Sequence, residues 1–133
     1  MKDVAQYPFA PRSTVRLERG HYWAIPLASG NFGAGCVVGR SVHNGKASTR
    51  MFLAGVVAWS GEKEPTVVDL RGCAIAHHGF THIKAITEAG GLILGKTDLK
   101  FGSLPSSLEA LAISTWGYGF PKLLAEKYVA AHS

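Results

Sequence analysis

The chain has 133 residues, of which 47% are hydrophobic and 17% are charged, and its formal net charge is +5. This balance excludes a disordered chain and predicts a single domain, residues 1–133, large enough to bury its own core. The longest apolar run, Met51–Trp59, falls well short of the roughly 20 residues that a membrane helix needs, and the first residues contain no apolar signal segment. We therefore expect a cytoplasmic protein with no membrane contact.

The first half of the chain predicts an arm followed by a β-hairpin. Residues 1–15 contain two prolines and no periodic pattern, so we expect an N-terminal arm. Apolar side chains alternate along Trp23–Leu27, which is typical of a strand, and Pro26 marks an edge or an end of that strand because proline cannot donate to a ladder. A turn leads to a second strand at 34–40. Close backbone approach in this hairpin explains a cluster of three glycines: Gly30, Gly33 and Gly35.

The middle of the chain predicts further strands. The Asn44-Gly45 pair is a strong turn signal. The apolar run 51–59 that follows has strand length and is apolar at every position, so we expect a central strand covered on both faces. After a polar loop we expect four shorter strands at 66–70, 73–77, 82–87 and 92–96, the last two forming a hairpin.

Helices are expected only near the C-terminus. Ser106 with Glu109 three residues later has the pattern of a capping box and predicts a short helix that continues to about Ile113. Pro121 is suited to the first turn of a second helix, which runs to the C-terminus. The fold class predicted is α+β: a mostly antiparallel, curled sheet or partial barrel with one or two C-terminal helices.

The stretch Gly90–Thr97, GGLILGKT, has the spelling of a phosphate-binding P-loop. A P-loop needs small or polar residues within the loop and a helix that starts at its Lys-Thr pair. Here three bulky aliphatic residues fill the loop, and a glycine and a proline follow too soon for a helix. We interpret Gly90 and Gly91 as turn residues with positive φ, and Leu92–Leu94 as a core strand.

The histidines and cysteines give no convincing active site. Adjacent strand residues point to opposite faces, so His77 and His78 cannot both bind one metal ion, and His82 lies in a poor helix context. Cys36 and Cys73 lie in apolar runs, which favour free, inert thiols. We expect no catalytic residue, no metal and no cofactor; an enzyme that pairs either thiol with a histidine is the least favoured alternative.

Charge and aromatic residues indicate a binding role. Residues 1–50 contain seven Lys or Arg against two acidic residues, whereas the rest of the chain is neutral. Such asymmetry favours an acidic partner or nucleic acid, although a solvated basic surface is the commoner outcome. Exposed aromatic and basic side chains supply most interface energy. We therefore select five partner-binding candidates: Arg40, Trp59, His78, Trp116 and Tyr118.

Two segments resemble a known family. Residues 19–39, RGHYWAIPLASGNFGAGCVVG, have a glycine, an aromatic pair, Ile-Pro-Leu and a Gly and Phe-Gly turn into an aliphatic strand; residues 91–96, GLILGK, form a second, shorter match. This pattern resembles the bacterial immunity protein 26 family, encoded beside polymorphic and contact-delivered toxins. The resemblance implies an immunity protein that neutralises a cognate toxin inside the producing cell. We expect it to act by occluding the active site or substrate path of the toxin. The alternative is a small basic β-rich protein that binds nucleic acid.

Overall fold

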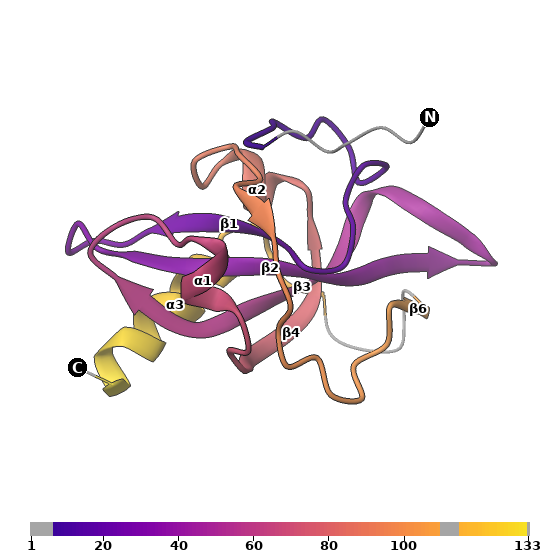
Figure 1. Cartoon of the computed structure of the whole chain (residues 1–133). Helices are drawn as coiled ribbons and strands as arrows, with labels where there is room; N and C mark the ends of the chain where they lie inside the picture. Colours follow the sequence, from indigo (N-terminus) through magenta and orange to yellow (C-terminus); the bar gives the residue numbers. More distant parts are fainter. Residues whose placement is uncertain (1–6, 110–114, 133) are drawn as a thin grey trace.

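A computed structural model of the chain describes residues 7–109 and 115–132. Within these ranges one curled, mostly antiparallel sheet is combined with two short helices and a longer C-terminal helix, which confirms the predicted α+β class. In chain order the elements are β1 His21–Pro26, β2 Phe32–His43, β3 Lys46–Gly61, α1 Val67–Leu70, β4 Ile75–His82, α2 Lys84–Thr87, β5 Gly95–Lys96, β6 Ser107–Glu109 and α3 Phe120–His132 (Figure 1).

The two long strands β2 and β3 form the backbone of the sheet. The strand order is β4-β3-β2-β1-β5, and all of these neighbours are antiparallel. The short strand β6 pairs in parallel with the second half of β2. Three register shifts interrupt the β2–β3 ladder, and such bulges bend a strand and increase its twist. The far end of the β2–β3 hairpin extends beyond the other strands (Figure 1).

Each face of the sheet carries an apolar core. Helices α2 and α3 cover one face, and α1 with the segment after β5 covers the other. The first core includes Trp23, Ile25, Phe52, Ile86 and Leu124. The second includes Tyr22, Leu53, Leu70, Phe80 and Leu99. Residues 52–57 of β3 are buried without interruption, which confirms that this run is a central strand covered on both faces.

Trp23 fixes the packing at the centre of the first core. Its side chain is 1% exposed and meets Phe52 edge to face, with ring centroids 5.9 Å apart. The indole lies against the backbone of Gly35 on the neighbouring strand, where an added Cβ would overlap the ring. The space at Gly35 therefore requires glycine, which confirms the predicted close approach at this position. The same prediction is wrong for Gly30, which has no atom within 4 Å of an added Cβ and is instead a turn residue with φ of 91°.

The predicted turns are confirmed by backbone angles. Asn44 and Gly45, between β2 and β3, have φ of 51° and 80°, the paired positive values of a type I′ hairpin turn. Gly90 and Gly91 have φ of 122° and 82° and lie in the turn after α2. Pro26 is the last residue of β1, which confirms that it marks the end of that strand.

Two of the expected short strands are wrong. Residues 67–70 form helix α1, because Thr66 and Asp69 make a capping box: the Thr66 hydroxyl accepts the Asp69 N–H, and the Asp69 carboxylate accepts the Thr66 N–H. Residues 84–87 form helix α2, which buries Ala85 and Ile86. Both segments are apolar and short, so periodicity alone does not separate helix from strand.

The helix expected from Ser106 is also wrong where the structure describes it. Residues 107–109 form β6, and the remainder of that prediction, 110–113, lies outside the described residues. Pairing with β2 overrides the local capping pattern: Arg40 donates its N–H to the Ser106 carbonyl at 2.9 Å, and Gly39 leaves the space for this approach. The C-terminal helix α3 is confirmed.

The strand predicted at 92–96 is reduced to Gly95 and Lys96. Ile93 instead forms a single bridge with Phe9 of the N-terminal arm. The arm packs on the sheet at a second point as well, where Thr14 donates its N–H to the Thr49 carbonyl at 2.9 Å. The hairpin expected between 82–87 and 92–96 is therefore wrong: residues 84–87 form helix α2, and Ile93 pairs with the arm.

We predict that Gly35→Ala destabilises the fold by about 2 kcal/mol or more, because the new methyl group forces Trp23 or strand β2 to move. Gly117→Ala is the matched control, since it is exposed, has no positive φ and has no atom within 4 Å of an added Cβ. Chemical denaturation of both variants measures the difference. Equal stability of the two variants would contradict the packing of Trp23 on Gly35.

Candidate functional site

The five candidate partner-binding residues do not gather into one patch. Arg40 is exposed and pairs across the ladder with Phe52, seven residues before Trp59 in β3. At about 3.3 Å per strand residue, Arg40 and Trp59 are about 23 Å apart along the sheet. His78 is exposed on β4, the strand at the opposite edge from β5. The five candidates therefore lie on separate parts of the described surface.

Trp116 and Tyr118 have opposite environments although they are two residues apart. Trp116 is half-buried: its ring lies against Gly79 of β4 and edge-on to Phe120, with ring centroids 5.6 Å apart. Its backbone N–H donates to the Phe80 carbonyl at 2.6 Å. Tyr118 is 49% exposed. Trp116 thus closes the first core, and Tyr118 is the member of the pair that a partner can reach.

Tyr118 lines a hollow of about 270 Å³, which we call the Tyr118 hollow. It lies between the end of β1, helix α2 with its following turn, and the start of α3. Apolar side chains supply most of its wall: Ile25, Pro26, Ala85, Ala89 and Pro121. The Lys84 ammonium lies 5.6 Å from the centroid of the Tyr118 ring, a cation–π contact that favours one orientation of the ring. Lys122 and Glu88 add charge to the lining.

The histidines of β4 point away from one another, as predicted. His78 pairs with Gly55 and His77 with Val56, and adjacent residues of a strand face opposite sides. Both side chains are exposed. Within residues 7–109 and 115–132, no three His, Cys, Asp or Glu side chains gather to hold a metal ion.

The two cysteines are free, and burial raises the pKa of both thiols. Cys36 is completely buried, and burial raises the pKa of its thiol to about 12. Cys73 is half-buried, its thiol lies 3.4 Å from the Asp69 carbonyl, and burial also raises its pKa. A thiolate at neutral pH is therefore disfavoured at both positions.

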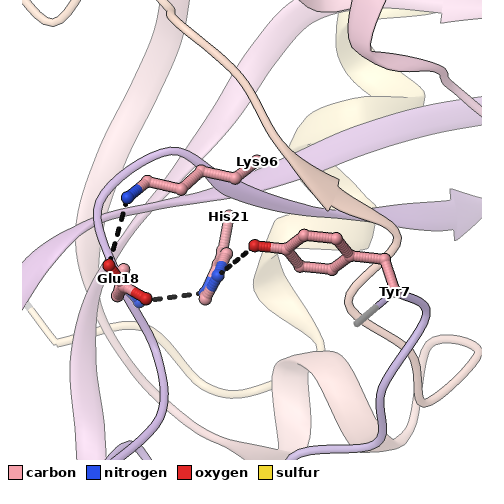
Figure 2. A network of polar contacts seen from close by, with 4 residues as sticks. All are labelled: Tyr7, Glu18, His21 and Lys96. Atoms are coloured by element: carbon pink, nitrogen blue, oxygen red, sulfur yellow. Dashed lines mark hydrogen bonds and ion pairs between the residues drawn. The ribbon is translucent and has the colours of Figure 1, made fainter. Parts of the chain in front are cut away.

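A polar network that the sequence did not reveal lies at the start of β1 (Figure 2). His21 is 1% exposed, and its Nδ1 accepts the backbone N–H of Glu18 at 2.9 Å. Its Nε2 lies 3.1 Å from the Tyr7 hydroxyl, and the Glu18 carboxylate pairs with the Lys96 ammonium at 3.1 Å. Because Nδ1 accepts, the neutral ring carries its proton on Nε2 and donates it to Tyr7. Tyr7 comes from the arm, so no spacing in the sequence signals this contact.

The environment of His21 favours its neutral form. Burial lowers its pKa, the positive charges of Lys96 and Arg16 lower it further, and Glu18 opposes the shift. Protonation of Nδ1 would also remove the acceptor of the Glu18 N–H. The pKa of Tyr7 is raised by burial and by the charge of Glu18, so the phenol remains a donor or acceptor rather than an anion.

The P-loop spelling does not form a P-loop. Gly95 and Lys96 are the two residues of β5 and pair with β1, and no helix begins at Thr97. The Thr97 hydroxyl donates to the Val67 carbonyl at 3.2 Å instead of facing a loop. The arched backbone that would surround a nucleotide phosphate is absent from this described segment, as the sequence predicted.

Comparison with known proteins gives no match: no family model, no curated protein and no solved structure is significantly similar to this chain. Across the described part of the chain, no helix has both the length and the apolar character required to cross a membrane.

We predict that His21 makes stability depend on pH. The pKa of His21 in the folded state lies below its unfolded value of 6.5. The contribution of neutral His21 to the free energy of unfolding is therefore fully present above pH 6.5 and is lost as the pH falls from 6.5 toward the folded pKa. His21→Asn removes the titration while keeping an acceptor near the Nδ1 position. Urea unfolding from about pH 8 to about pH 5 should therefore show a steeper loss of stability in the wild type than in the variant. Identical slopes would contradict the account, since the exposed histidines are common to both proteins.

Proposed function

We propose that this chain is an immunity protein that binds and neutralises a bacterial toxin, with the Tyr118 hollow at the centre of the interface. The observation that carries the proposal is Tyr118: a large aromatic side chain, 49% exposed, beside an apolar hollow built from three separate segments. Tyrosine in such a setting is among the residues that dominate binding energy at interfaces. The resemblance of residues 19–39 and 91–96 to the immunity protein 26 family supports the choice of a toxin as the partner.

The hollow fits a side chain of a protein partner. Its volume of about 270 Å³ is at or below the small end of ligand pockets, and its wall is largely apolar with charged Lys122 and Glu88 in the lining. An apolar centre with a polar rim is the usual anatomy of a protein interface. A standard interface buries about 800 Å² on each partner, so the contact extends beyond the hollow to neighbouring surfaces.

The proposal is tested by co-expressing the chain with the toxin domain encoded immediately upstream of its gene. We predict rescue of growth by the wild type, and weakening of toxin binding by Tyr118→Ala by about 2 kcal/mol, roughly 30-fold in Kd, because the aromatic anchor is lost. Binding is measured with the purified pair by calorimetry.

Val15→Ala is the matched control, because Val15 is an exposed apolar residue, 61% exposed, that does not line the hollow. We expect this variant to bind like the wild type. Failure of the wild type to protect cells would refute the function, whereas equal binding by the two variants would refute only the assignment of the interface.

Nucleic-acid binding is a second candidate, favoured by one feature of the β2–β3 hairpin. From Arg19 to Gly61 the sequence contains no acidic residue. Four exposed side chains on the hairpin are basic or titratable: Arg40, His43, Lys46 and Arg50. A carboxylate-free projecting hairpin of this kind attracts phosphate groups.

If nucleic acid is the partner, affinity for a short DNA duplex should fall linearly with salt on a logarithmic scale, and Lys46→Ala with Arg50→Ala should reduce the slope by about two, one for each lost phosphate contact. Fluorescence anisotropy at increasing salt measures both effects. A flat response to salt would exclude this candidate.

A further inference from the structure

A second hollow, lined by three cationic side chains, lies near the start of β1. It forms where the loop before β1, the residue after α1 and the chain around β5 meet, and its volume is about 480 Å³. This volume falls within the range of about 300–1,000 Å³ typical of small-molecule sites. Arg19, Arg71 and Lys96 line it together with Phe101. We call it the Arg19 pocket.

Arg19 is held in position before any ligand arrives. Its guanidinium carbon lies 4.1 Å from the centroid of the Phe101 ring, and its Nη2 donates to the Leu104 carbonyl at 2.8 Å. A guanidinium has five N–H donors in a fixed plane, and the bond to Leu104 uses one of them. Stacking on Phe101 and the hydrogen bond to Leu104 therefore orient the guanidinium and leave its other N–H donors available to a ligand.

Backbone hydrogen bonds tie the three segments of the pocket together. Thr97 donates its N–H to the Gly20 carbonyl at 3.0 Å, and Gly72 donates to the Asp98 carbonyl at 2.8 Å. Gly20 has φ of 98°, and an added Cβ there would lie 2.7 Å from the Thr97 carbonyl oxygen. The loops that carry Arg19 and Arg71 are thus both anchored to the chain beside Lys96. Such anchoring lowers the entropy cost of binding a ligand.

The charges of the pocket favour an anion. Lys96 is paired with Glu18 at 3.1 Å, and Asp98 is the one carboxylate in the lining. Among residues 7–109 and 115–132, neither Arg19 nor Arg71 has a carboxylate oxygen within 4.0 Å. Two guanidinium groups without an ion-pair partner, beside an ammonium, are the donors that recognise phosphate.

We infer that the Arg19 pocket binds the phosphate group of a small phosphorylated molecule, a property separate from the proposed binding of a toxin. The phosphate oxygens accept from Arg19 and Arg71, and Lys96 exchanges its contact with Glu18 for one with the ligand. The rest of the ligand lies along Phe101 and Val67. This site uses Lys96 of the GGLILGKT stretch, but through side chains from three segments and not through a P-loop.

The test is calorimetric and NMR titration of the full chain with adenosine monophosphate, ribose phosphate and inorganic phosphate as probes, and with adenosine as the unphosphorylated control. We expect saturable binding of the phosphorylated probes and none of adenosine. Arg71→Ala should weaken binding about tenfold or more, because a charge-assisted hydrogen bond is lost. Arg71 is exposed, so this variant is expected to fold normally.

Lys127→Ala is the matched control, since it removes one exposed positive charge from helix α3, outside the pocket, and should bind the probes like the wild type. Absence of saturable binding by every phosphorylated probe would overturn the inference. Binding of adenosine as tight as that of the phosphorylated probes would also overturn it, as would equal weakening of probe binding by the two variants. Binding of an oligonucleotide but of no small probe would overturn it as well, because the ligand would then be a polymer.

Discussion

The contact between Trp23 and the bare backbone of Gly35 determines how the rest of this molecule is arranged. The indole occupies the space of a missing side chain, and β2 changes register between Gly33 and Gly35. A bulge at this point bends the strand and contributes to the curl of the sheet. Gly33 serves helix α3 in the same way, because an added Cβ there would lie 2.9 Å from the Ala125 methyl group. The two glycines thus set both the curvature and the docking of the helix.

Both faces of the sheet are covered by core, and the two hollows described above lie at the margins of the sheet. Strand β1 is buried along His21–Ile25. The Arg19 pocket lies at the start of this strand, and the Tyr118 hollow lies at its end, beside Ile25 and Pro26. The first is lined by cations and the second is largely apolar. Because the two hollows share no lining residue, a substitution in one leaves the lining of the other unchanged.

The sequence predicted the elements whose signals are strong and local. The hairpin at Asn44-Gly45, the central strand, the glycine turns and the C-terminal helix all have such signals. The prediction was wrong where a segment distant in the chain determines the local structure. Strand β6 forms because β2 offers an open edge, and Ile93 pairs with the N-terminal arm. The His21 network and the Arg19 pocket were missed for the same reason. Tyr7 reaches His21 only in the folded chain, and Arg71 and Lys96 come to line one pocket only there. Of the partner-binding candidates, Tyr118 alone combines high exposure with a hollow.

The segment that resembles the immunity protein family, residues 19–39, is also the segment that builds the core, so the resemblance bears on the sheet more directly than on the binding surface. The most direct measurement of the central packing is the proton NMR spectrum of Gly35. The Hα that occupies the direction of a Cβ points at the Trp23 ring, so the ring current should shift that proton strongly upfield, with cross-relaxation to the indole protons. Hα shifts typical of an unstructured glycine, without such cross-relaxation, would contradict the account.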